Sequence, residues 1–416
     1  MASPTQSGDR SSEFGRFWWG EAVSGLGSAI TSLALQTLLL ITLHGGAAQV
    51  GWLNSARWLP YLLLGLVVGA LVDRVRRRPV MIITDVARAA LLGLIPLAWA
   101  FGVLTFPLLL IVILLFGTAS LVNDAASMSF VPRLVPRGQL QRAHARLDGA
   151  SAVAQTAGPA LAGVLIRVVG APLSVLVDAL TYLFSAVMVA SLKGVSEPTA
   201  NKPAKVGARG LALEVRDGAR WVYGESGLRR LAVSTHVWFA GQAVLLVLVV
   251  PYAYFQLNLT PLQLGLVFAV AGLGALLGAS MSTAVGLRLG TGGAIICSHS
   301  GTALGVAIML VAASVPTGWA GAAVLAAGQL CHGWAMGTSN SHEMSFRQAL
   351  TPDELQARTN TTLRSLNRAV IVVVSPVAGL LADRFGYRQT LAAAVAIFVG
   401  SALILALSPF RRVRVD

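Results

Sequence analysis

Long apolar stretches, each bounded by polar or charged residues, follow one another along almost the whole chain. A membrane-spanning helix needs about 20 mostly apolar residues, because its backbone must rise through roughly 30 Å of hydrocarbon. The pattern therefore predicts an all-α membrane protein with twelve transmembrane helices, near residues 17–43, 48–72, 79–101, 104–127, 145–169, 172–192, 230–256, 262–285, 293–314, 318–343, 359–382 and 388–409.

Short motifs recur between the two halves of the chain. Met128-Ser129-Phe130 returns as Met344-Ser345-Phe346, an offset of 216 residues, and Pro136 returns as Pro352 at the same offset. Paired glycines support this division, Gly65 and Gly69 with Gly274 and Gly278, and Gly163 and Gly170 with Gly379 and Gly386. The sequence thus predicts two pseudo-symmetric six-helix bundles, at residues 1–193 and 230–416.

Residues 194–229, between the two predicted bundles, form a polar linker. From Leu211 to Val222 the apolar positions follow helical spacing with charged residues between them, which predicts a short amphipathic helix on the cytoplasmic face. A similar short segment, residues 130–140, is expected to connect the fourth and fifth spans.

Composition agrees with a membrane protein. Only 12% of the residues are charged, about half the share in soluble domains, and the mean hydropathy is +0.72. The first fourteen residues are polar and have no apolar core preceded by positive charge, so no cleavable signal peptide is expected. Arginine greatly exceeds lysine, and alanine and glycine abound, which suggests a bacterium with a GC-rich genome.

The net charge of +14 is distributed unevenly. With twelve spans, the arginine and lysine clusters fall on one side of the membrane, at residues 74–78, 133–146, 193–230 and 411–414. Because positively charged loops stay in the cytoplasm, both termini are predicted to be cytoplasmic. Anionic lipid explains the basicity, so no nucleic acid partner is expected.

The loop between the second and third spans combines Gly69 and Asp73 with a run of arginines from Arg74 to Arg78. A glycine lets two helices approach closely, and the arginines hold the loop in the cytoplasm. An aspartate at a helix end can accept hydrogen bonds from the free amides at the start of another helix, which makes a latch that can open. A basic stop between two spans would explain the arginines but not the spacing of Gly69 and Asp73.

This loop resembles the cytoplasmic signature loop of the major facilitator superfamily of secondary transporters. The resemblance implies two parallel halves, with the substrate bound near the midplane between them, and alternating access. It also implies a cytoplasmic gate. In that gate Asp73 caps the start of the eleventh helix, and Asp124, at the end of the fourth span, meets Arg74 or Arg77.

Ionisable residues within the spans are candidates for function, because they are costly there unless they line a cavity or pair with each other. Glu21 in the first span and Asp178 in the sixth have no obvious local partner, whereas Asp85 and Arg88 share one face of the third span. Desolvation favours the protonated form of a lone carboxyl group. Glu21, then Asp178, then Asp85 are therefore the candidate proton-coupling residues.

Each of these carboxylates also has a structural interpretation. Glu21 would reach to Arg16 at the membrane surface, and Asp178 would form a hydrogen-bonded brace with Thr181 or Tyr182. Asp85 and Arg88 would be an ion pair that braces helices.

The fifth span contains Gly158 and Pro159, followed by Gly163. The proline removes an internal hydrogen bond and the small residues permit tight packing, which predicts a bend that acts as a pivot. A merely kinked and packed helix fits nearly as well. The segment is similar to the antiporter motif of drug exporters, although Ala154 and Ala162 replace two of its glycines.

Further segments resemble the bacterial branch that contains macrolide efflux proteins and the enterobactin exporter, namely Phe17-Trp18-Trp19-Gly20, residues 132–136, Gly158-Pro159 and residues 178–182. The resemblance implies proton-driven export of drugs, siderophores or secondary metabolites. Arg76 departs from the signature loop, Ser282 and Thr283 replace its expected duplicate, and the fourth span lacks the arginine that many drug antiporters carry. This last departure leaves the proton route open.

Together these features predict a monomeric transporter of the bacterial inner membrane that exports amphipathic small molecules by proton antiport and confers multidrug resistance. A proton-coupled importer or facilitator, and a non-transporting sensor or scaffold, are the alternatives. No nucleophile with a base, metal cluster or nucleotide loop is evident, so no enzyme activity, metal or cofactor is predicted. The residues expected to line the substrate cavity are polar: Gln36, Arg57, Gln155, His236, Gln242, His332, Asn367 and Arg368.

Overall fold

The computed structural model describes residues 4–72, 74–193, 208–224 and 227–414. In these residues the regular structure is helical throughout and contains no strand, which confirms the predicted all-α class. The chain forms two compact units. The first unit consists of residues 1–43 and 56–206, and the second of residues 44–55 and 207–416.

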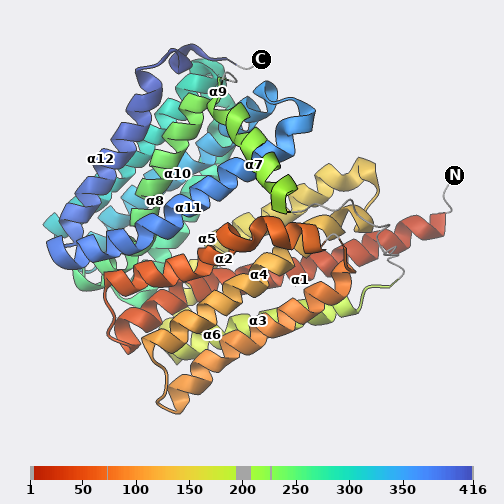
Figure 1. Ribbon diagram of the computed structural model, residues 1–416. Coiled ribbons are helices and arrows are strands. Elements are labelled where there is room, and N and C mark those ends of the chain that lie inside the picture. The colour runs from red at the N-terminus through yellow and green to blue at the C-terminus, as the bar shows by residue number, and fades with distance from the viewer. Residues whose placement is uncertain (1–3, 73, 194–207, 225–226, 415–416) are drawn as a thin grey trace. The chain divides into compact units, whose positions relative to one another are not determined.

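The first unit is a bundle of long helices that lie alongside one another (Figure 1). Helix α1 packs against α5 and α6, and α3 packs against α4 and α6. The last turn of α1 continues into a π-helical turn, Leu38–Thr42. The helices are α1 (Pro4–Thr37), α2 (Ala47–Val72, whose first residues belong to the second unit), α3 (Arg77–Ala100), α4 (Phe106–Leu134), α5 (Leu140–Val169) and α6 (Ala171–Ala190).

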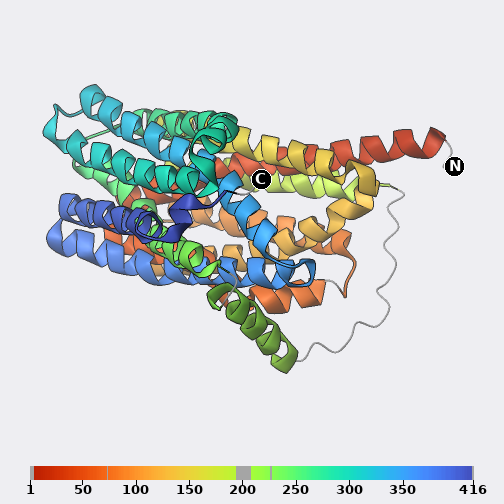
Figure 2. The same cartoon turned by 90° about the horizontal axis from the view of Figure 1, so that it is seen from above.

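In the second unit the helices coloured from teal to dark blue run alongside one another in both views (Figures 1 and 2). Helix α9 packs against α10, α12 against α8 and α9, and α11 against α7 and α8. The helices are α7 (Ala208–Tyr223), α8 (Arg229–Phe255), α9 (Pro261–Val311), α10 (Trp319–Leu350), α11 (Asp353–Phe385) and α12 (Tyr387–Ala406).

Helix α9 covers two of the predicted spans, because the chain kinks at Gly290 without leaving the helix on either side. Gly290 has φ 71°, a left-handed conformation that glycine adopts without the steric conflict of a Cβ atom. The eighth and ninth predicted spans are thus joined by a kink rather than by a loop.

Within the described residues, nine helices are long and apolar enough to cross a membrane, and α9 is one of them. Helices α2 and α10 are not among the nine, so the count of twelve spans stays a prediction.

The connector expected at residues 130–140 is largely helical. Helix α4 continues to Leu134, because Phe130, Val131 and Leu134 are buried in an apolar core of the first unit. A 3-10 turn, Arg137–Gln139, follows before α5 begins. Helix α7 lies where an amphipathic helix is predicted. Residues 194–207 of the predicted linker lie outside the described residues.

Candidate functional site

A buried ion pair between Asp85 and Arg88 occupies one face of α3. The Nδ2 atom of Asn123, on α4, donates to Asp85 Oδ1 at 3.1 Å and to Thr84 Oγ1 at 2.8 Å. The Arg88 guanidinium lies 4.1 Å from the ring centroid of Tyr182 on α6. The ion pair that the sequence permits is therefore present, and its partners link α3 to α4 and α6.

Glu21, on α1, is partly exposed and accepts a hydrogen bond from Ser127 Oγ of α4 at 3.1 Å. The Arg88 guanidinium is near enough to act on Glu21 electrostatically. Arg16 is directed elsewhere, since it donates to Glu13 Oε1 at 3.2 Å and to a backbone carbonyl at the end of α6. The expected alternative, a contact between Glu21 and Arg16, is therefore wrong.

Asp178, on α6, has no solvent exposure. Thr181 Oγ1 donates to Asp178 Oδ1 at 3.0 Å, as the structural interpretation expects. The hydroxyl of Thr31 on α1 also acts on Asp178 as a hydrogen-bond donor. Arg88 and Arg57 act on Asp178 electrostatically. We call Glu21, Asp85, Arg88 and Asp178 the acidic cluster.

The carboxylates of the acidic cluster have different hydrogen-bond partners. Asp85 is paired directly with Arg88, whereas the hydrogen-bond donors to the side chains of Glu21 and Asp178 in the described part of the chain are hydroxyl groups. A hydroxyl can donate to a carboxylate or accept from a carboxylic acid, while arginine can only donate. Glu21 and Asp178 can therefore keep their hydrogen bonds in both protonation states, which suits a group that binds and releases a proton.

The predicted gate is described only in part. Asp73 lies outside the described residues, so its capping of the eleventh helix stays a prediction. Gly69 is in the last turns of α2, and Arg77 is the first residue of α3. Tyr61 donates to Asp124 Oδ2 at 2.6 Å. The predicted pairing of Asp124 with Arg74 or Arg77 stays a prediction.

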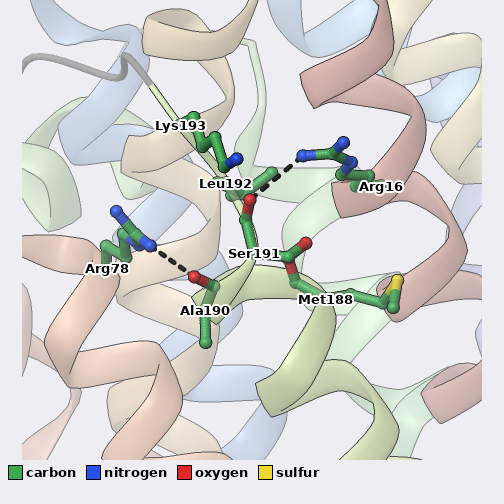
Figure 3. Close-up of a pocket in the computed structure, with 7 residues that line it drawn as sticks. All are labelled: Arg16, Arg78, Met188, Ala190, Ser191, Leu192 and Lys193. Carbon is green, nitrogen blue, oxygen red and sulfur yellow. Dashed lines mark hydrogen bonds between the residues drawn. The ribbon is translucent and has the colours of Figure 1, made fainter.

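The end of the signature loop is fixed to the end of α6. Arg78 donates through Nε to the Val189 carbonyl at 3.1 Å and through Nη2 to the Ala190 carbonyl at 2.5 Å. Arg16 of α1 donates to the Ser191 carbonyl at 3.0 Å, beside a surface pocket of about 770 Å³ (Figure 3). Cations are favourable at a helix C-terminus, whose last carbonyls have no partner within the helix. These contacts give Arg16 and Arg78 a structural role at the end of α6.

The predicted pivot lies within α5, where Pro159 is internal to the helix. Gly158 and Gly163 are buried. A Cβ atom at Gly158 would lie 2.4 Å from the Cβ atom of Ala29 on α1, so the glycine permits close contact between these helices. The packing and the proline agree with both interpretations, a pivot and a fixed kink.

The second unit contains a buried polar pair that sequence reasoning missed, Glu343 on α10 and His299 on α9. Their Oε1 and Nε2 atoms are 3.5 Å apart, and the side chains are 17% and 2% exposed. Ser339 Oγ donates to Glu343 Oε1 at 2.6 Å, and Thr235 Oγ1 of α8 donates to Glu343 Oε2 at 3.3 Å. The repeat between the two halves of the chain could have indicated this site. Glu343 lies 216 residues after Ser127, the hydrogen-bond partner of Glu21, and 216 residues is the offset of that repeat.

Of the residues predicted to line a cavity, the structure brings together His236 and Asn367. His236 Nδ1 lies 2.6 Å from Asn367 Oδ1 of α11, and the Tyr223 hydroxyl of α7 contacts the other ring nitrogen. His332 stacks on Trp238 with ring centroids 6.4 Å apart. These contacts join α7, α8, α10 and α11 within the second unit.

The remaining cavity candidates have different environments. Gln155 is exposed and bonds to its neighbour Ser151 on α5, so it is a surface residue of this helix. Arg57 donates to Ser32 Oγ at 3.1 Å. Gln36 and Gln242 each have a buried Oε1 atom without a hydrogen-bond partner in the described part of the chain, and Arg368 is half-buried on α11. The described residues contain no group of three or more histidine, cysteine, aspartate or glutamate side chains placed to hold a metal ion.

Several known proteins are similar to this chain. The multidrug efflux pump Tap of Mycobacterium tuberculosis is 28% identical over 306 residues, which cover 70% of this chain and 69% of the pump. Macrolide efflux protein A of Streptococcus pyogenes is 27% identical over 182 residues, 44% of each chain. These relatives confirm the resemblance to the drug and macrolide efflux branch.

Solved structures share the fold at low sequence identity. A bacterial homologue of the iron transporter ferroportin, in an inward-facing state, has a TM-score of 0.77 at 15% identity and covers 98% of this chain and 99% of its own. The nucleoside transporter NupG has a TM-score of 0.76 at 13% identity and covers 95% of this chain and 98% of its own. The sequence profile of the Major Facilitator Superfamily matches residues 17–367. The chain therefore belongs to the Major Facilitator Superfamily of multi-pass membrane transporters.

Proposed function

We propose that this transporter exports amphipathic small molecules, such as drugs, siderophores or secondary metabolites, in exchange for protons by alternating access. Relatives named as multidrug and macrolide efflux proteins support the direction and the substrate class. The observation that carries the proton coupling is the acidic cluster, in which hydroxyl groups donate to Glu21 and Asp178 while Arg88 is paired with Asp85.

The charge balance of the acidic cluster explains how proton binding and release can drive the transport cycle. Two guanidinium groups, which cannot lose their protons, act on a larger number of carboxylates. The guanidinium groups are those of Arg88 and Arg57, and the carboxylates are Glu21, Asp85, Asp124 and Asp178. Excess charge in a membrane interior is costly, so the cluster gains from binding a proton when it is shielded from water. Access to water on the inner side favours release. Glu21 is the first candidate for this proton because it is partly exposed, and Asp178 and Asp85 follow.

Movement of the helices would couple this proton to the substrate. Gly158, Pro159 and Gly163 of α5 provide the pivot against α1. Asp73 and Arg74, with the residues named above for the gate, close the cytoplasmic side. Each half then contributes polar residues to the substrate path.

The Glu343–His299 pair is a further proton candidate, in the second unit. Thr235 and Arg347 border the same small cavity as Glu343, and Asn367 links that cavity to His236. Loss of a proton shared by a carboxylate and an imidazole leaves the imidazole neutral and changes the net charge of the pair from zero to −1. Arg347 of the same helix acts electrostatically on Glu343, and Arg364 of α11 acts on Arg347.

The same proposal includes orientation and partners. The transporter lies in the bacterial inner membrane as a monomer with both termini in the cytoplasm, because the arginine-rich segments then face anionic lipid. Its partners are protons, a small-molecule substrate and the bilayer. It requires no nucleic acid, metal or cofactor, and it is not an enzyme.

Flux measurements test this function. A panel of dyes and antibiotics is offered to vesicles that contain the purified protein, with and without an imposed pH gradient. Uphill movement of a compound against the proton flow supports an antiporter. Movement with the proton flow would identify an importer, gradient-independent equilibration a facilitator, and no movement of any compound a sensor or scaffold.

A further inference from the structure

The end of α11 repeats the pattern of the signature loop. Residues 379–384 read Gly-Leu-Leu-Ala-Asp-Arg, and residues 69–74 read Gly-Ala-Leu-Val-Asp-Arg. The glycine, leucine, aspartate and arginine keep the same spacing. Asp383 thus stands at the end of α11 as Asp73 stands at the end of α2.

Asp383 caps the start of α2. Its Oδ1 and Oδ2 atoms accept hydrogen bonds from the backbone amides of Ala47 and Ala48, each at 3.0 Å. A helix start leaves such amides without partners, and usually a side chain of the N-cap residue accepts from them. Here that position is Gly46, which has no side chain. A Cβ atom at Gly46 would lie 3.0 Å from Asp383 Oδ2, so the glycine leaves room for a carboxylate from another helix.

Close packing continues from the cap along the two helices. A Cβ atom at Gly379 would lie 2.3 Å from the Ala47 carbonyl oxygen, so the backbones nearly touch. Further along, Asn54 Nδ2 donates to Ser375 Oγ at 2.8 Å, and Ser55 Oγ donates to the Val372 carbonyl at 2.7 Å. These contacts hold residues 44–55 in the second unit, whereas the rest of α2 belongs to the first.

We propose that Asp383 is a releasable latch that holds α2 to α11 at the end of α2 opposite the signature loop. The 26 residues of α2 span about 39 Å, so Asp383 acts at the end of this helix that is far from the signature loop. Asp383 is exposed, and water can replace its two hydrogen bonds when the helices separate. The latch needs neither a particular direction of transport nor proton coupling, so its test is independent of the proposed function.

Thiol labelling measures the opening of this end. A cysteine replaces Ser375, which is fully buried on α11 where it faces α2, in a protein whose Cys297 and Cys331 are changed to serine. The full-length protein is purified in nanodiscs, so that both ends are accessible to the reagent. In this background Asp383→Ala is expected to raise the labelling rate by about 2- to 30-fold, the range that the loss of a helix cap allows. The control Asp148→Asn removes an exposed carboxylate on α5 and should leave the rate unchanged.

A second variant separates a latch from a simple helix cap. Gly46→Ser, added to Asp383→Ala, supplies a capping hydroxyl within α2 itself, but it makes no bond to α11. If Asp383 is a latch, the labelling of this double variant stays as fast as in Asp383→Ala, because the new cap does not hold α2 to α11. An unchanged labelling rate in Asp383→Ala, or slow labelling restored by Gly46→Ser, would overturn the proposal.

Discussion

Replacement of Glu21 by glutamine tests the proton site most sharply. Glutamine keeps the size of the side chain, and its carbonyl oxygen can still accept the hydrogen bond from Ser127 Oγ, now 3.1 Å from Glu21 Oε1. It cannot release a proton, so it imitates the permanently protonated state. Arg88 remains paired with Asp85, and the fold of the cluster should persist.

The expected size of the effect follows from the exchange of one proton. One pH unit corresponds to about 1.4 kcal/mol, so a gradient of two units supports a substrate gradient of up to about 100-fold. Glu21→Gln should reduce this ratio to about one. Substrate binding should change by less than about tenfold, because at most one neutral hydrogen bond of about 0.5–1.5 kcal/mol is altered.

Proteoliposomes provide the assay. Substrate accumulation is measured at a fixed pH gradient for the wild type, Glu21→Gln and the control Asp148→Asn, and downhill exchange is measured without a gradient. We expect accumulation to vanish only in Glu21→Gln, while its exchange continues. Uphill pumping by this variant would refute the role of Glu21, and the same substitution test would then move to Asp178.

Three further predictions concern the other charged residues. Arg88→Met leaves the Asp85 carboxylate buried without its partner and should lower the free energy of unfolding by about 3–5 kcal/mol. Adding Asp85→Asn should restore most of this free energy. An unchanged denaturation midpoint in the single variant would show that the pair contributes little. Asp73→Asn should leave the protein folded but slow transport, since a cap contributes about 0.5–2 kcal/mol, and normal flux at normal expression would show that the loop only anchors topology. Glu343→Gln removes the charged partner of His299 and should reduce substrate accumulation at a pH gradient more than downhill substrate exchange. An equal reduction of accumulation and exchange would show that the pair only packs α9 against α10.

The sequence predicted the helices well because the bilayer imposes a simple requirement on each of them. Length and hydropathy alone locate most spans, since every backbone polar group in hydrocarbon must be paired within the helix. Helix ends were harder to predict. The kink at Gly290 and the extension of α4 to Leu134 depend on backbone conformation and on burial of side chains by other helices. Neither is visible in local hydropathy.

The charged site was predicted in part. Spacing revealed the Asp85–Arg88 pair, because residues three apart share a helix face. The contact between Ser127 and Glu21 joins helices that are 106 residues apart, and no local pattern indicates such a pairing. Glu343 was missed because it lies at the end of a predicted span, where a charged side chain is expected to reach water.

Asp383 belongs to a sequence pattern that did not by itself predict a site. Its pattern matches that of the signature loop, but the repeat that relates the two halves has an offset of 216 residues and does not pair these two segments. Both patterns lie at the C-terminal end of a helix, but residues 379–384 follow residues 69–74 by 310 positions rather than by 216. Its partner became clear only from the hydrogen bonds to Ala47 and Ala48.

Proton movement in response to substrate tests the central claim most directly. Purified protein is placed in liposomes that enclose a pH-sensitive dye, with equal pH on both sides, and a substrate is added outside. An antiporter that admits the substrate must release protons from the lumen, so the lumen should become alkaline, and Glu21→Gln should abolish the change. A lumen that stays at constant pH while substrate enters, or one that becomes acidic, would contradict proton antiport.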